Sequence, residues 1–89
     1  MQELYVGQSI CKDELEQTHL FQYHLLTDEL MYDGIRCPDY GILVRSGDGV
    51  QTSIPHITSD RNRIDSLISL LQEHQVSPVH LQDIVEDWL

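Results

Sequence analysis

Apolar and polar residues alternate through much of the first half of the chain, a pattern typical of β-strands with one buried face. Residues 3–10 carry Leu4, Val6 and Ile10 at positions of the same parity, so we expect these three side chains to be buried. The next alternating segment covers residues 18–26. Its apolar residues of one parity are Phe21, Tyr23 and Leu25.

Residues that disfavour strands interrupt the pattern after this point. Thr27-Asp28-Glu29 predicts the end of the second strand. A short further strand is expected at about residues 30–36, where Asp33-Gly34 is a strong tight-turn signal because both residues tolerate positive φ.

The clearest turn in the chain is Ser46-Gly47-Asp48-Gly49. Residues 40–45 before it and residues 50–54 after it both alternate between apolar and polar positions. We therefore predict a β-hairpin over residues 40–54, with its turn at residues 46–49.

After Pro55 the apolar period lengthens to that of an α-helix. The first helix is predicted at about residues 60–74, and its N-cap candidates are Thr58, Ser59 and Asp60. The second is predicted at about residues 78–88, because Ser77-Pro78 has the form of an N-cap followed by proline at the first helical position. The helical residues expected in the core are Ile64, Leu67, Ile68, Leu71, Leu81, Ile84 and Val85.

Strands followed by helices define an α+β domain, in which an antiparallel sheet of four to five strands carries two C-terminal helices packed on one face. The sheet residues expected beneath the helices are Phe21, Tyr23, Leu25, Ile42 and Val44. The chain has 89 residues, which is enough for one domain, 1–89.

Acidic residues outnumber basic ones by 15 to 5, which gives a net charge of −10. An apolar content of 40% is too high for a disordered acidic tail. Without clustered Lys and Arg we expect no direct nucleic-acid binding, and an anionic membrane would repel the chain. No apolar run of about 18 residues and no signal-peptide pattern occurs, so we expect a cytoplasmic protein.

Candidate reactive residues are few. Two cysteines, Cys11 and Cys37, are too few for a disulfide framework, and we expect both to be reduced and not bonded to each other. None of the five histidines stands in a CxxC, HxxxH or HExxH motif, and the nearest approach to a metal site is His74, His80 and Asp83. We therefore predict no catalytic, cofactor or metal site, and no enzyme activity.

The two predicted helices also have the order of a helix-turn-helix. Its apolar positions would be Leu70, Leu71, Val76, Leu81 and Ile84. The second helix contains acids and no arginine or lysine, so it would repel phosphates, and Gln75 stands where that turn prefers glycine. An ordinary helical hairpin is therefore the favoured interpretation.

Charges at the helix ends oppose the helix dipoles. Arg61 and Arg63 lie in the first turn of the first helix, and Glu86 and Asp87 lie near the end of the second. An antiparallel arrangement would remove the conflict. We therefore predict that Arg61 or Arg63 forms an ion pair with Glu86 or Asp87.

The last thirteen residues, Ser77 to Leu89, read SPVHLQDIVEDWL. Together with Tyr40-Gly41-Ile42 and Thr58-Ser59-Asp60-Arg61, this stretch resembles a domain-of-unknown-function family of small acidic bacterial proteins. Members similarly place β-hairpins first and end in a helix of the S-P-x-H-L-x-D-[IV]-[IV]-E-D-[FW]-L type. The resemblance implies a cytoplasmic bacterial protein and implies no activity.

The function expected from these features is that of a small non-enzymatic interaction module that binds a basic protein surface. The candidate partner-binding residues are Asp83, Glu86, Asp87 and Trp88. Two alternatives remain open. One is an inhibitor of a DNA-binding or nuclease protein that mimics nucleic acid, of the anti-restriction or anti-CRISPR type. The other is a small regulator that contains a helix-turn-helix.

Overall fold

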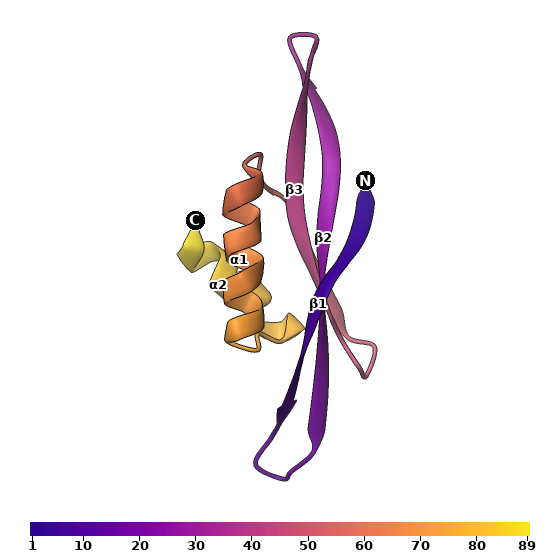
Figure 1. Ribbon diagram of the computed structural model, residues 1–89, viewed down its shortest axis with the longest axis vertical. Coiled ribbons are helices and arrows are strands. Elements are labelled where there is room, and N and C mark those ends of the chain that lie inside the picture. Colours follow the sequence, from indigo (N-terminus) through magenta and orange to yellow (C-terminus); the bar gives the residue numbers. More distant parts are fainter.

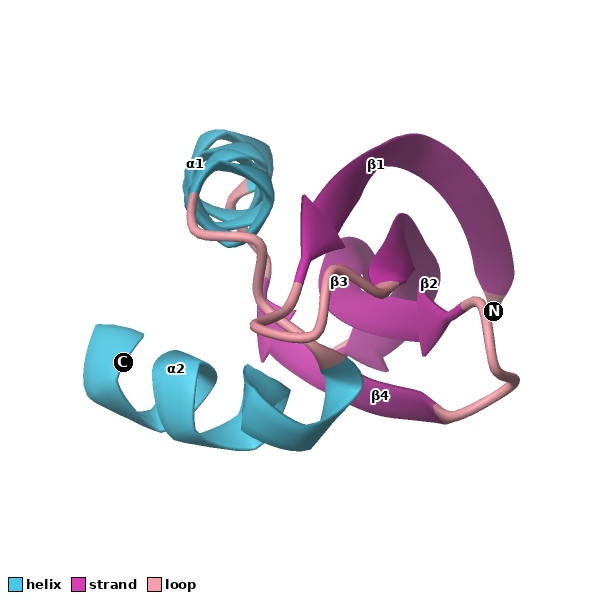
Figure 2. Ribbon diagram, turned by 90° about the horizontal axis from the view of Figure 1, so that it is seen from below, coloured by secondary structure: helices cyan, strands magenta, loops and turns pink.

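The computed structural model describes all 89 residues. The strands are β1 (Gln2–Lys12), β2 (Thr18–Tyr32), β3 (Ile35–Ser46) and β4 (Gln51–Thr58). The helices are α1 (Arg61–Glu73) and α2 (Leu81–Trp88), and a 3-10 turn, η1 (Pro78–His80), leads directly into α2. Both helices lie on one face of the sheet (Figures 1 and 2), which confirms the predicted α+β architecture.

The sheet is antiparallel with the order β1-β2-β3-β4, so each strand pairs with the next one along the chain. The predicted hairpin is present as β3 and β4: the Ser46 amide donates to the Val50 carbonyl at 2.7 Å. No separate strand exists at residues 30–36. Asp33 and Gly34, both at positive φ, instead form the tight turn between β2 and β3.

The β2–β3 hairpin extends beyond the other strands as a two-stranded arm (Figure 1). Its register continues to Tyr32↔Ile35, whereas β1 pairs only as far as Thr27 and β4 only as far as Tyr40. The strand end predicted at residues 27–29 is therefore wrong. Two acids lower strand propensity only weakly, and in-register pairing with β3 outweighs that preference.

The core lies between the helices and the front face of the sheet, which we define as the face toward α1 and α2. Its buried residues are Phe21, Tyr23, Leu25, Ile42, Val44, Ile64, Leu67, Ile68, Leu71, Val76, Leu81 and Val85. Of the core residues predicted on β2, β3 and the helices, every one is buried except Ile84, which is half-buried.

The predicted buried face of β1 is wrong. Leu4, Val6 and Ile10 are 46%, 38% and 58% exposed. A bulge leaves Val6 without a partner and changes the parity, so Leu4 lies on the front face and Ile10 on the back. The front face of β1 instead presents Gly7 and Ser9 beneath α1.

Small residues occupy this part of β1, where α1 lies close above it. A Cβ atom on Gly7 would overlap the side-chain amide of Gln72. The Ser9 hydroxyl donates to the Gln72 carbonyl at 3.0 Å, and the Tyr23 hydroxyl donates to the Val76 carbonyl at 2.9 Å. These two bonds tie the end of α1 and the turn after it to the sheet.

The helix ends follow the predicted signals in part. The Asp60 carboxylate caps α1 by accepting from the Asn62 amide at 2.9 Å. Ser77 precedes Pro78 as predicted but makes no side-chain cap bond, and the second helix begins as the 3-10 turn η1. Between the helices, Gln75 adopts a left-handed backbone with φ of 52°.

The molecule is elongated, with principal extents of 54 × 23 × 17 Å. None of its helices has the length and apolar content needed to cross a bilayer. Cys11 on β1 and Cys37 on β3 are free thiols.

Candidate functional site

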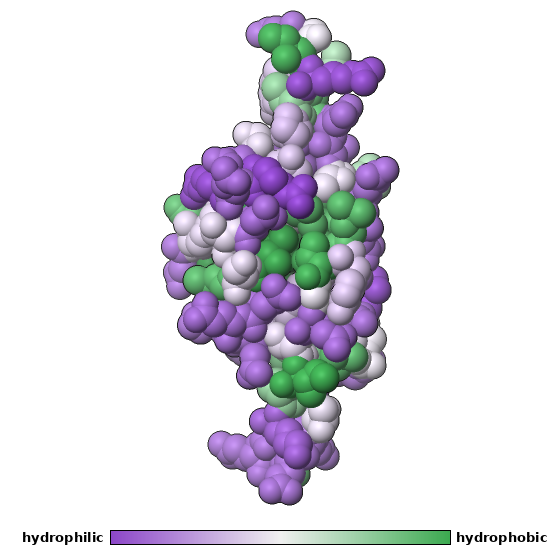
Figure 3. Space-filling view, in the orientation of Figure 1, coloured by the Kyte–Doolittle hydropathy of each residue, from purple (hydrophilic) through white to green (hydrophobic).

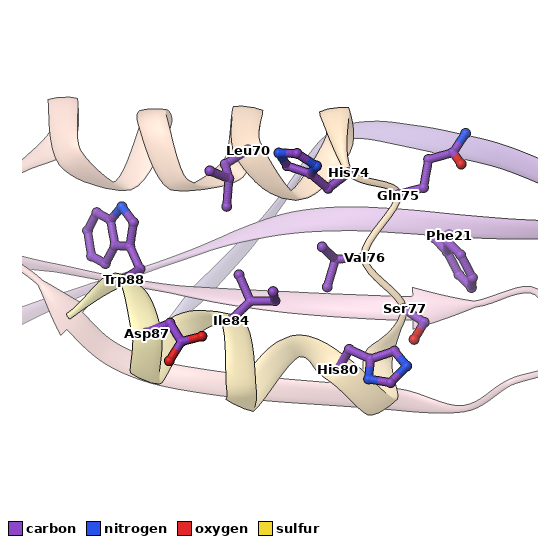
Figure 4. Close-up of a pocket in the computed structure, with 10 residues that line it drawn as sticks. All are labelled: Phe21, Leu70, His74, Gln75, Val76, Ser77, His80, Ile84, Asp87 and Trp88. Atoms are coloured by element: carbon purple, nitrogen blue, oxygen red, sulfur yellow. The ribbon is translucent and has the colours of Figure 1, made fainter.

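A groove of about 600 Å³ runs between α1 and the η1–α2 segment. The residues that line it are Phe21, Leu70, His74, Gln75, Val76, Ser77, His80, Ile84, Asp87 and Trp88. Leu70 and Ile84 point toward one another across the groove, Phe21 lies at one end, and Trp88 and Asp87 lie at the other (Figure 4). Leu70, Ile84 and Trp88 are only half-buried, so the walls present apolar surface that the chain itself leaves uncovered.

Both ends of the groove are held in place. At the turn end, Val76 is buried, and its carbonyl accepts the hydrogen bond from the buried Tyr23 hydroxyl. At the other end, the Arg63 guanidinium lies over the Trp88 ring at 4.5 Å from its centroid, a cation–π contact. The groove is therefore part of the folded structure and does not need a ligand to form it.

The contact between Arg63 and Trp88 corrects the predicted ion pair. The start of α1 does lie beside the end of α2, but neither Arg61 nor Arg63 pairs with a carboxylate of α2. Arg61 pairs with Asp65 of its own helix at 3.0 Å and lies over the Tyr40 ring. An aromatic face offers an arginine both apolar contact and electrostatic attraction, and sequence spacing does not distinguish it from a carboxylate.

The four candidate partner-binding residues divide into two groups. Asp87 and Trp88 line the groove at the same end (Figure 4). Asp83 and Glu86 are exposed on α2 outside it, and the Glu86 carboxylate accepts from the Gln82 amide at 3.2 Å. Trp88 is half-buried, with Arg63 over its ring. Its ring is therefore neither fully enclosed in the core nor fully exposed to solvent.

The surface around the groove is acidic. Residues 60–89 contain six acids and two arginines. Arg61 and Arg63 contact aromatic rings, and Arg61 also pairs with Asp65, whereas Asp83, Glu86 and Asp87 form no ion pair. A positively charged group that approaches the groove therefore meets carboxylates that no cation of the chain neutralises.

The chain contains no arrangement suited to a metal ion. No three residues of the His, Cys, Asp and Glu types lie close enough together to hold one. His74 and His80 both line the groove but are exposed, and Asp83 lies outside it. The other three histidines each contact one carboxylate: His19 lies 2.9 Å from Asp13, His56 contacts the buried Asp39, and His24 lies beside Glu3.

The back face of the sheet carries a polar cluster around His24, which lies away from the groove and which the sequence did not suggest. His24 is 8% exposed, and its Nδ1 lies 3.1 Å from Oε1 of Glu3, which also pairs with Arg45 at 3.5 Å. The Nε2 atom of His24 is buried without a partner, and Tyr5 packs edge-on against the ring. Burial lowers the pKa of His24, the Glu3 carboxylate opposes that shift, and Arg45 adds to it.

The only signal for this cluster was parity. His24 alternates with the core residues Tyr23 and Leu25, so it had to lie on the other face of β2. That the back face would bury it could not be foreseen, because its cover comes from neighbouring strands of a strongly twisted sheet (Figure 2).

Fold and groove together define a class, that of small acidic α+β domains with a four-stranded antiparallel meander, a helix pair on one face and an apolar groove between the helices. The chain belongs to DUF6514, a family of unknown function whose family model matches residues 2–89. This match confirms the predicted membership of a domain-of-unknown-function family. No curated protein and no solved structure matches the chain.

Proposed function

We propose that this protein is a non-enzymatic interaction module, and that its groove between α1 and η1–α2 receives an apolar side chain from a basic segment of a partner protein. One observation carries the proposal. An apolar groove that the fold itself holds open lies beside carboxylates that no cation of the chain neutralises.

The two features serve different parts of binding. Burial of an aliphatic or aromatic anchor in a preformed groove supplies most of the affinity, because the residues that line the groove are already ordered before the partner binds. Carboxylates at the rim raise the association rate of a positively charged segment and select against acidic ones. Asp87 lies beside Trp88 at one end, so the matching partner segment has a Lys or Arg next to its anchor.

The sole tryptophan provides a direct assay, because Trp88 lines the groove. Two synthetic peptides that share the same apolar residues, one flanked by Lys and Arg and the other by Asp and Glu, are titrated while Trp88 fluorescence is followed. We expect a response to the basic peptide alone, weakening as salt increases. A response of equal strength to both peptides would contradict the charge argument.

A matched pair of variants tests the groove with natural partners. Ile84→Asp places a carboxylate inside the groove, whereas Val79→Asp places one at a position of η1 that is 75% exposed and outside it. Proteins captured from an extract of the native host should be retained by the wild type and by Val79→Asp, lost with Ile84→Asp, and released by about 0.5 M salt. Capture that is the same for all three proteins, or insensitive to salt, would refute the proposal.

Shape favours one second candidate, an inhibitor that mimics nucleic acid. The molecule is a rod 54 Å long with a net charge of −10. A DNA duplex of that length carries about 32 phosphates, more than twice the 15 acids of this chain, so the charge density supports the idea less than the shape does. Competition with DNA for a nuclease tests it directly.

A helix-turn-helix regulator is less well supported. Its second helix would have to enter the major groove of DNA. Here α2 contains no arginine or lysine and exposes Asp83, Glu86 and Asp87. We therefore propose no direct nucleic-acid binding.

A further inference from the structure

The two edges of the sheet differ in how they are protected against pairing with another strand. Unprotected edges invite a further strand, and proteins usually interrupt them with proline, bulges or charge. β4 contains Pro55 and, next to it, His56 in a left-handed conformation with φ of 59°. β1 contains no proline in its 11 residues, its only lysine or arginine is Lys12 at the very end, and its one interruption is the bulge at Val6.

β1 also exposes an unusual amount of apolar side chain for one strand. Tyr5 and Ile10 are 55% and 58% exposed, and Leu4 and Val6 are exposed as well. Apolar surface is visible along the path of β1 in the space-filling view (Figure 3; compare β1 in Figure 1). Ser9 is the only buried residue of the strand, and Leu4, Tyr5, Val6 and Ile10 all leave apolar surface exposed in the single chain.

We propose that β1 pairs with β1 of a second copy of this chain, antiparallel and around a two-fold axis at Gln8, to form a continuous eight-stranded sheet. The faces of β1 define this register. Tyr5 and Ile10 lie on the same back face as Gln8, because their partners on β2 all have even numbers. Tyr5 then lies opposite the partner's Ile10, and Gln8 lies opposite itself.

The charges of β1 match in the same register. Glu3 and Lys12 also lie on the back face, at the two ends of the strand. Lys12 is the only lysine of the chain and forms no ion pair within it. Antiparallel pairing around Gln8 places Lys12 opposite the partner's Glu3, twice per dimer.

The bulge of β1 fits this arrangement. In each strand Val6 is the additional residue of the bulge, so Gly7 lies opposite the partner's Ser9. Front-face residues of one copy then lie opposite front-face residues of the other on both sides of the axis. The Ile10 carbonyl points out of the sheet, since Gln75 donates to it from outside at 3.4 Å. Gln75 is exposed, and an incoming strand displaces its side chain.

Sedimentation of the intact chain tests the pairing. We expect a dimer of twice the 10.3 kDa chain mass at high concentration. Lys12→Glu sets two carboxylates opposite each other and should raise the dimer dissociation constant about tenfold. Arg36→Glu makes the same change in net charge at a side chain that is 77% exposed on the arm, and should change that constant less than about twofold.

Cross-linking tests the axis itself. In Gln8→Cys the two introduced sulfurs meet at the two-fold axis, where paired Cα atoms about 5.5 Å apart suit a disulfide. Gln51→Cys places the same residue on the edge of β4 as the control. Mild oxidation of Gln8→Cys should give a symmetric disulfide between the two substituted positions, identified by peptide mass, and Gln51→Cys should give no such product.

Three outcomes would overturn the proposal. The first is a monomer at all concentrations up to about 1 mM. The second is a dimer that Lys12→Glu and Arg36→Glu weaken equally. The third is a dimer in which Gln8→Cys gives no symmetric linkage. None of these outcomes bears on the groove between the helices, which is lined by different residues and is tested by different variants.

Discussion

Replacing Tyr23 with phenylalanine removes one buried hydroxyl from the junction between the sheet and the turn that closes the groove. Tyr23 has no exposed surface, and its hydroxyl donates to the Val76 carbonyl at 2.9 Å. Val76 is 6% exposed, so water does not readily replace the lost donor. A buried carbonyl left without a partner costs about 1–3 kcal/mol, and we expect Tyr23→Phe to lower the free energy of unfolding by about 1–2 kcal/mol.

This loss is large for the protein. A domain of 89 residues typically has a free energy of unfolding of about 4–13 kcal/mol. Each kcal/mol corresponds to a fall in melting temperature of about 4–8 °C at this size. Urea and thermal unfolding followed by circular dichroism measure both quantities. Tyr32→Phe is the matched control, because Tyr32 is 61% exposed.

High pH provides a second measurement on the same hydroxyl. Burial raises the pKa of Tyr23 above its ordinary value of 10.0, and the nearby Ser9 hydroxyl offsets part of that shift. Because the folded pKa is the higher one, the stabilisation is complete below about pH 10 and is lost as pH rises through the folded pKa. Tyr23→Phe should lack this alkaline loss. A variant within about 0.3 kcal/mol of the wild type, with an unchanged alkaline profile, would refute the reasoning.

Three further changes test other parts of the structure. A Cβ on Gly41 would lie 2.6 Å from the Pro55 Cα, so Gly41→Ala should lower the free energy of unfolding in urea by about 1–3 kcal/mol. Gly47→Ala is the control and should change it little, because its Cβ would make only ordinary contacts. Asp60→Ala removes the α1 cap and should lower the unfolding free energy by about 1 kcal/mol; no change would mean that the cap is dispensable. The pKa of His24 is lowered by burial, so its stabilisation is present above the unfolded value of 6.5 and is lost as pH falls through the folded pKa. Unfolding measured between about pH 7.5 and pH 5 should therefore show a steeper loss for the wild type than for His24→Leu, by at most about 1.4 kcal/mol per pH unit, and equal slopes would contradict this assignment.

The sequence predicted those strands and helices in which regularly spaced apolar residues all lie on a single buried face. β2, β3 and α1 each bury residues at regular spacing, and the helices cover a single face of the sheet, so patterns such as Phe21, Tyr23 and Leu25 were sufficient. The turn signal at Asp33-Gly34 was correct, but the pattern around it predicted one short strand where two long strands meet. Cross-strand pairing on both sides of this turn extends the two strands, and the strand propensity of single residues does not record such pairing.

β1 shows the opposite case. Its apolar residues alternate like those of a buried strand, but the bulge at Val6 shifts the alternation by one residue. Leu4 and Ile10 therefore lie on opposite faces of the sheet. The close approach of α1 selects Gly7 and Ser9 for the buried side, which no hydrophobic pattern indicates. The prediction of a strand was confirmed there, whereas the prediction of its buried face was wrong.

The candidate site was predicted in part for a similar reason. Asp87 and Trp88 belong to the groove, but its walls also include Ile84, which helical periodicity assigns to the core, and Leu70, which was named only as a helix-turn-helix position. Both are half-buried, and the turn between the two helices is held to the sheet by the bond from Tyr23 to Val76. That bond joins residues 53 positions apart, so only the folded structure shows that the two helices leave a groove between them.

The two proposed surfaces respond to salt in opposite directions, and this follows from the net charge of −10. A basic segment in the groove is attracted by unneutralised carboxylates, so screening weakens its binding. Two copies joined through β1 repel each other as whole chains, and among the charged groups only the two proposed pairs of Glu3 with Lys12 oppose that repulsion. We expect the repulsion between whole chains to exceed those two attractions, so screening by salt should strengthen the dimer. A partner bound in the groove also lowers the net negative charge of each copy, so a basic partner should promote self-pairing even though it contacts α2 and not β1.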